Sequence, residues 1–300
     1  MNSLKFIRLI AIALLIICVS ACRAQKSSIQ HIDAEVQTIS LPAFDAIQNQ
    51  SAVRLHITQG NRQSVRVKQA QGWHLKLSVS RNTLILETQG HPNQQKSAEV
   101  WITIPSLKAI SNDGALNVDI SNFKSKELRI NNGGALTLNA GKIDLGTFKF
   151  KNEGAITSEI SMVCDEVHID NDGSLKTQFT VTDNNIFDLN NEGCINGNIN
   201  VSGNTIKIDN DGAMNGDMNL NATTLTIDND GSGKQEIAFT GNVMDLKNDG
   251  AVNVGLTVDC KTLKAKSSGV SYLVISGSAD DTQIKSEGVS KIDSIKLNKM

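Results

Sequence analysis

A glycine returns every 19 or 20 residues from the middle of this chain to its end, and this register constrains the fold more than any other feature. Each glycine sits in a five-residue segment of the form N-x-G-A-L or a close variant, and two weaker copies, SSGVS and SEGVS, follow. A repeat of this length predicts stacked units that each pack on the next one. The aligned glycines are Gly114, Gly134, Gly154, Gly173, Gly193, Gly212, Gly231, Gly250, Gly269 and Gly288.

Apolar residues recur at even offsets from each glycine. Around Gly212, for example, Ile206, Ile208, Met214 and Met218 lie six and four residues before it and two and six residues after it. Even offsets put these side chains on one face of a strand, and no 3.6-residue period competes with them. A unit this short buries its apolar face only against neighbouring units. The sequence therefore predicts an all-β, parallel β-helix or solenoid of ten coils, about 48 Å long at about 4.8 Å per coil. The usual crossover chirality makes its expected hand right-handed.

The N-x-G segment is expected to form the turn between strands, at the first eight glycines above all. Glycine adopts positive φ without a Cβ penalty, which suits a tight turn. The asparagine two residues earlier, as at Asn171 and Asn210, is expected to bond the equivalent asparagine one coil away and so build a ladder. The small residue after the glycine is expected to face a cramped, inward corner.

Residues 43–105 follow a different pattern from the repeats at 106–300. Segments such as AVRLHITQG and AEVWITIP alternate like strands but share no period. Residues 49–53, NQSAV, resemble a degenerate first corner. We expect irregular coils or a small β-cap here, because an uncovered solenoid end leaves an open strand edge.

The N-terminus has the layout of a bacterial lipoprotein signal. Lys5 and Arg8 precede an apolar run at 9–17 that has signal-peptide length. Val19-Ser20-Ala21-Cys22 then resembles a lipobox, in which small residues admit a signal peptidase. An ordinary signal peptide with a chance cysteine is the alternative.

Cleavage would remove residues 1–21 and leave Cys22 as an acylated terminus, carrying chains such as palmitate, with residues 22–42 as a tether. Several acyl chains anchor a protein stably, at about 0.8 kcal/mol per buried methylene. We therefore expect a lipid-anchored protein of the bacterial cell envelope, whose membrane partner is reached through this anchor. Arg23 is not the aspartate that retains some lipoproteins in the inner membrane, so the outer membrane is expected in a Gram-negative cell.

Three segments carry a family resemblance. They are the pattern F-x-x-I-x-x-x-x-x-V-x-L-x-I-x-x-G at 44–60, the segment WITIPSLKAISNDGAL at 101–116, and the repeated N-x-G-A-L corner. With these segments the chain resembles the head-GIN-domain family, whose members are described as auto-transporter adhesins. The resemblance implies a β-solenoid that acts in adhesion, and it brings no catalytic motif with it.

Carboxylates recur one and three residues before the glycines, which makes Asp209, Asp211, Asp228 and Asp230 the candidates for a calcium site. Like charges stacked every 4.8 Å or so repel unless they are screened or bridged, and calcium prefers oxygen ligands of this kind. The spacing is not that of the nine-residue calcium-binding β-roll. We interpret the residues as solvated turn acids, expect no metal and no cofactor, and keep calcium as the alternative.

Cysteine positions predict free thiols. Cys164 and Cys260 each lie nine residues before a repeat glycine, five coils apart, or about 24 Å. A disulfide needs Cα atoms within about 7 Å, so these two cannot pair. Cys194 occupies the alanine place of its own corner, and all three thiols are expected to be packed and unpaired.

Net charge and coil spacing reduce the number of possible functions. Loss of Lys5 and Arg8 with the signal leaves 27 basic against 31 acidic residues, which argues against nucleic-acid binding. The spacing admits no insertion between Gly114 and Gly288 that could wall a catalytic cleft. We expect a non-enzymatic lipoprotein that presents its solenoid to a cell-surface or envelope polymer or protein. The alternatives are a polysaccharide-acting enzyme of the parallel β-helix type and a structural spacer.

Overall fold

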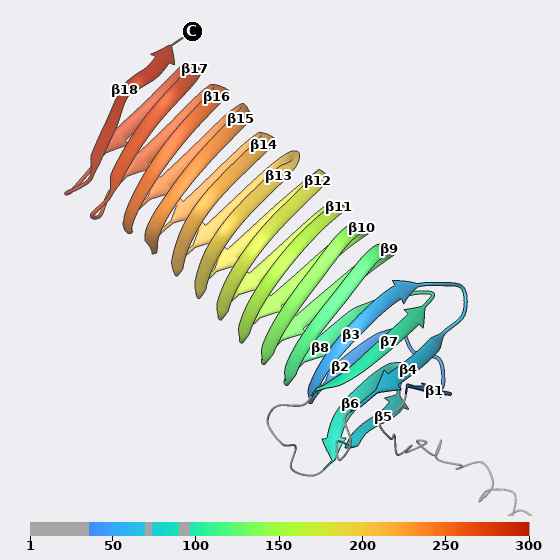
Figure 1. The fold of residues 1–300 in the computed structure, drawn as a ribbon. Coiled ribbons are helices and arrows are strands. Elements are labelled where there is room, and N and C mark those ends of the chain that lie inside the picture. Colours follow the sequence, from blue (N-terminus) through green and yellow to red (C-terminus); the bar gives the residue numbers. More distant parts are fainter. Residues whose placement is uncertain (1–35, 70–73, 90–96, 300) are drawn as a thin grey trace, which may run out of the picture.

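A computed structural model describes residues 36–69, 74–89 and 97–299, and within them it contains strands and no helix. Figure 1 shows a long rod of parallel turns with a smaller group of strands at its N-terminal end. This architecture confirms the predicted all-β, parallel solenoid with coils of about 19 residues. The strands are β1 (Gln37–Ile39), β2 (Ala46–Asn49), β3 (Ala52–Gln59), β4 (Ser64–Lys68), β5 (His74–Ser80), β6 (Thr83–Gln89), β7 (Ala98–Ile104), β8 (Ala109–Asn112), β9 (Ala115–Asn132), β10 (Ala135–Asn152), β11 (Ala155–Asn171), β12 (Ser174–Asn191), β13 (Cys194–Asn210), β14 (Ala213–Asn229), β15 (Ser232–Asn248), β16 (Ala251–Ser267), β17 (Tyr272–Ser286) and β18 (Lys291–Lys299).

Each strand from β9 to β17 winds around the rod and pairs in parallel with the next one, and β18 closes the series. The register joins equivalent residues, so Leu136 lies between Leu116 and Ile156. Like therefore stacks on like, and the even apolar offsets in the sequence become continuous buried columns. Four phenylalanines of the core, Phe148, Phe150, Phe179 and Phe187, lie with neighbouring ring centroids 5.8 to 6.4 Å apart.

The difference between 19- and 20-residue coils has a local cause. The three 20-residue coils that begin at Gly114, Gly134 and Gly173 contain Asn122, Lys142 and Asp183, each with φ between 52° and 56°. Strand pairing skips the extra residue, for instance between Gly141 and Ile143. The extra residue thus bulges out at a left-handed position and leaves the register of the next coil intact.

The first coil is interrupted by the cap. β2 and β3 pair in parallel with β8 and β9, so the chain leaves the solenoid after Gln59 and returns at Ala109. The intervening strands turn antiparallel: β4 pairs with β1 and β7, and β5 with β6. β6 and β7 also pair with β2 and β3, and they cover the N-terminal edge of the first coil.

Asparagines form a buried ladder along the rod. Asn49 donates to Asn112 at 2.8 Å, and the chain of side-chain amide bonds continues without a break to Asn229. Each asparagine stacks on its equivalent in the next coil, so one buried side chain satisfies the next. Asn49 belongs to the first corner, at residues 49–53, and this corner lies in register with the corner of the following coil.

The expected role of positive φ at the corner glycines is wrong. Among the ten aligned glycines, only Gly269 and Gly288 have positive φ, at 71° and 68°. At Gly212 the constraint is the neighbouring coil, because an added Cβ would lie 2.1 Å from the carbonyl oxygen of Gly193. Gly154, Gly173 and Gly193 show the same close approach to the preceding coil. Glycine is needed here because two backbones touch.

Candidate binding groove

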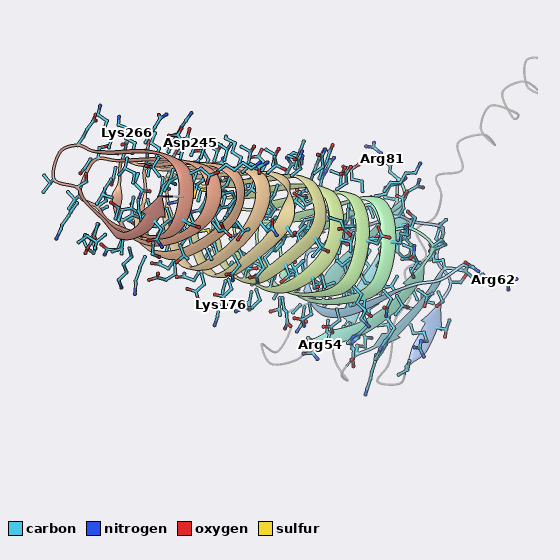
Figure 2. All side chains as sticks on the ribbon, turned by 90° about the horizontal axis from the view of Figure 1, so that it is seen from above. Arg54, Arg62, Arg81, Lys176, Asp245 and Lys266 are labelled. Atoms are coloured by element: carbon cyan, nitrogen blue, oxygen red, sulfur yellow. The ribbon has the colours of Figure 1, made fainter. Side chains whose placement is uncertain are left out.

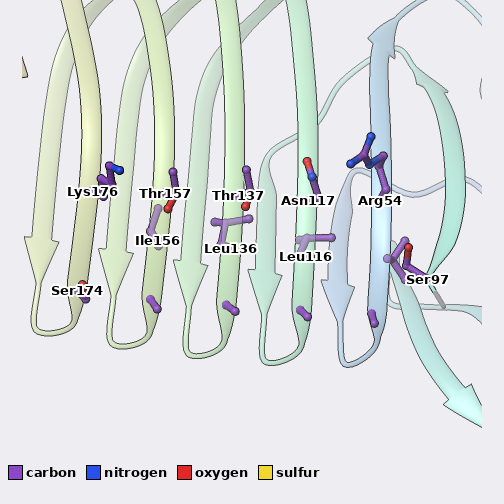
Figure 3. Close-up of a pocket in the computed structure, with 15 residues that line it drawn as sticks. Arg54, Ser97, Leu116, Asn117, Leu136, Thr137, Ile156, Thr157, Ser174 and Lys176 are labelled. Carbon is purple, nitrogen blue, oxygen red and sulfur yellow. The ribbon is translucent and has the colours of Figure 1, made fainter. Parts of the chain in front are cut away.

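A groove of about 590 Å³ runs along the rod beside the N-x-G corner and crosses five strands, β3, β9, β10, β11 and β12. Strand register arranges its lining in columns (Figure 3). The outer column holds the residues directly after the corner, Ala52, Ala115, Ala135, Ala155 and Ser174. Two residues further along each strand lies a second column, Arg54, Asn117, Thr137, Thr157 and Lys176.

The small residues after the glycines point outward, and the expectation of an inward corner is wrong. Ala115, Ala135 and Ala155 are exposed, whereas the next residue in each strand, such as Leu136, is buried. The asparagine before the glycine is the inward residue. Because these outward side chains are short, their column forms the floor of the groove.

Cationic side chains stand at the two ends of the groove. Arg54 and Lys176 are its only ionisable lining residues among those described, and they are four strand steps, or about 19 Å, apart. Neither makes an ion pair within the part of the chain that the structure describes. Figure 2 shows them on one side of the rod, with Asp245 and Lys266 on the other.

The acidic stripe lies on the other side of the corner and is bridged by lysines. Lys207 Nζ lies 2.9 Å from Asp209, and this hydrogen bond raises the lysine pKa. Lys247 Nζ lies 3.0 Å from Asp228, 3.7 Å from Asp230 and 3.0 Å from Asp249. Lysine ammonium groups therefore occupy the place between carboxylates that a calcium ion would need.

The pKa values of this cluster reflect the same contacts. Hydrogen bonds to Asp228 and Asp249 raise the pKa of Lys247. The pKa of Asp249 is lowered by the hydroxyl of Ser268 and then by Lys247. Asp211 is exposed at its turn. Of the described residues, no three His, Cys, Asp or Glu side chains are placed to hold a metal ion together.

Three cysteines of the solenoid are free, as predicted. Cys164 and Cys260 are buried and Cys194 is partly exposed. Burial raises the pKa of the Cys164 thiol to about 11 and also raises that of Cys260. Both buried thiols are therefore protonated at neutral pH and pack as small apolar groups.

The predicted lipidation residue, Cys22, lies outside the described residues, as do the whole signal at 1–21 and the first part of the tether. In the described remainder, no helix has the length and hydropathy to cross a membrane.

The sequence did not single out Arg54 or Lys176. Each stands in a frame position that asparagine or threonine fills in the coils between them, and this interruption of a polar column was the available signal. This replacement indicates a site only once the strand register places Arg54 and Lys176 in the same column of the same groove.

The fold and groove define a class of protein: a parallel β-solenoid with a side-chain array open to solvent along its axis. Residues 43–178 match the sequence profile of the family described as "Putative auto-transporter adhesin, head GIN domain". This region of the chain is therefore similar to the head GIN domain family. This similarity supports a non-enzymatic, adhesin-like role and a place at the cell surface or in the envelope.

Solved structures include similar chains. A "putative adhesin" from Parabacteroides merdae is 14% identical, with a TM-score of 0.47, over 88% of this chain and 99% of its own. A "putative lipid binding protein" from Parabacteroides distasonis is also 14% identical, with a TM-score of 0.46 and the same coverage. No curated protein is similar enough to count as a relative.

Proposed function

We propose that this protein is a lipid-anchored, adhesin-like binding protein of the bacterial cell envelope, whose solenoid presents the groove to a surface or envelope ligand. The observation that carries the proposal is the groove itself. Across five strands, four alanines and Ser174 align beside a polar column, and the cations at the ends of that column have no ion-pair partner among the described residues. No enzymatic step is part of the proposal. Hydrolysis or cleavage of a polysaccharide by the purified protein would favour the enzyme alternative.

Binding is tested with the full chain on envelope material. Ala135→Trp fills the middle of the groove, and Ala238→Trp is the control because Ala238 is also exposed and does not line this groove. We expect the unaltered protein and Ala238→Trp to retain envelope material in a pull-down, and Ala135→Trp to retain much less. Retention of nothing by any of the three would favour a spacer and contradict the proposal.

The anchor is tested separately. Cys22→Ala removes the thiol that would be acylated, so the variant should fail to incorporate labelled fatty acid and should leave the membrane fraction or remain unprocessed. Cys194→Ala, which changes a cysteine of the solenoid, should label as the unaltered protein does. Fatty acid on Cys22→Ala would disprove the anchor.

A further inference from the structure

We propose that the groove binds an acidic polysaccharide lying along the solenoid axis. This inference rests on the proposed binding function and names the chemistry of its ligand. Three observations support it: the positive charge at the ends of the groove, the pairing of a polar column with an apolar column, and the absence of a free strand edge in the described floor of the groove.

Charge selects an anionic ligand. Among the described residues Arg54 and Lys176 have no carboxylate partner, whereas lysines close to the corner elsewhere are paired, such as Lys151 with Glu153 at 2.6 Å. No carboxylate lines the described groove. Two unpaired cations at the ends of a groove without acids attract a chain with anionic groups spread along it.

The columns between these ends match a sugar chain. Asn117, Thr137 and Thr157 place polar side chains at regular steps of about 4.8 Å, although the amide oxygen of Asn117 is itself buried. Beside them the methyl groups of Ala115 and Ala135 form a low apolar strip. A pyranose has hydroxyls at its edge and C–H groups on its face, so a glycan can use both columns at once.

An acidic peptide fits less well. The groove crosses the strands, and each of β9 to β12 is already paired on both sides. A peptide strand therefore finds no edge to extend, and its own N–H and C=O groups would lack regular partners. A polysaccharide has no such backbone to satisfy.

Binding of defined polymers tests the inference. We expect the full chain to bind polygalacturonate, and to bind neutral dextran and poly-glutamate far more weakly. Arg54→Ala and Lys176→Ala should each weaken polygalacturonate binding roughly two- to fivefold, since each removes one exposed charge contact. Added salt should weaken polygalacturonate binding by the unaltered protein. It should have a smaller effect on the variant that carries both Arg54→Ala and Lys176→Ala.

Matched variants separate the outcomes. Lys264→Ala removes another lysine that has no ion pair within the described structure. Lys264 lies in register with Asp245 on the opposite side of the rod, so this variant should bind as the unaltered protein does. Equal binding of poly-glutamate, or equal weakening by all three alanine variants, would overturn the inference. If envelope material is retained through the groove but polygalacturonate is not bound, the ligand class is wrong and the binding function stands. If neither is bound, both fail.

Discussion

The side-chain amide of Asn171 donates a 2.6 Å hydrogen bond to the amide oxygen of Asn191, the residue in the same place one coil further along. Asn171 also donates to the carbonyl oxygen of Gly173 and accepts from Asn152. One side chain thus holds its own turn and joins three coils. The ladder ends at Asn229, and the next equivalent residue, Asn248, has a side-chain amide that is buried without a partner among the described residues.

This contrast predicts unequal costs for the same substitution. Asn171→Ala should lower the free energy of unfolding by about 2–3 kcal/mol, because it leaves partners in two neighbouring coils unsatisfied. Asn248→Ala should cost under about 1 kcal/mol, since no side-chain hydrogen bond is lost. Urea denaturation of both variants is the measurement. Equal losses would mean that the ladder bonds contribute little.

Close backbone contact predicts a large effect at Gly212. Gly212→Val should destabilise by about 2–3 kcal/mol or more, because the neighbour it meets is a backbone carbonyl that cannot move aside. Asp211→Ala, at an exposed turn acid, should cost under about 0.5 kcal/mol. Gly141 has nothing within 4 Å of an added Cβ, so Gly141→Ala should be neutral or stabilising by up to about 1 kcal/mol. If denaturant melts gave the same free energy of unfolding for all three variants, the close contact between the backbones of Gly212 and Gly193 would be disproved.

A buried glutamine predicts a stabilising substitution. Gln235 is 1% exposed, and neither side-chain polar atom has a partner in the described structure. It pairs between Gly216 and Val254, in a position where other coils hold Val118 or Leu138. Gln235→Leu should raise the free energy of unfolding by about 1–3 kcal/mol, since it removes two unsatisfied groups.

Gln178→Leu is the control for this substitution, because Gln178 is exposed and the change should leave stability nearly unaltered. If Gln235→Leu destabilises instead, a buried water satisfies the glutamine and the interior is hydrated at this coil.

Thiol reactivity should separate the three solenoid cysteines. With the pKa of Cys164 raised to about 11, its thiol stays protonated at pH 8 and should react slowly with a disulfide reagent. Its reaction should accelerate as pH rises toward that value and on unfolding. Partly exposed Cys194 should react first. Reducing and non-reducing gels should match for the monomer, and an intramolecular disulfide would contradict the coil register.

Calcium should not stabilise the folded chain. Lys247 already bridges Asp228, Asp230 and Asp249, so calcium chloride and EDTA should give the same denaturation midpoint. Lys247→Met should lower the midpoint at low salt, with a smaller difference at high salt, because repulsion between the carboxylates is then screened. A calcium-dependent rise that Asp211→Ala or Asp228→Asn abolishes would restore the acidic stripe as a metal site.

The repeat made much of this fold predictable, because in-register stacking turns each sequence offset into a column. Buried columns, the asparagine ladder and the unpaired thiols all follow from position relative to the glycine. Two expectations at the corner failed for one reason. A single coil, considered alone, does not show how closely Gly193 and Gly212 approach, or that Ala135 faces outward while the asparagine before it faces in.

The sequence by itself determined the class of fold, the number of coils and the residues that stack, since periodicity and strand alternation are local properties of the chain. Tertiary structure alone decided where the extra residue of a 20-residue coil bulges, how strands β4 to β7 leave and close the first coil, and which side chains share a surface. Arg54 and Lys176 are 122 positions apart in the chain. They face one groove only because the cap excursion returns in register and each coil then advances by a single strand spacing.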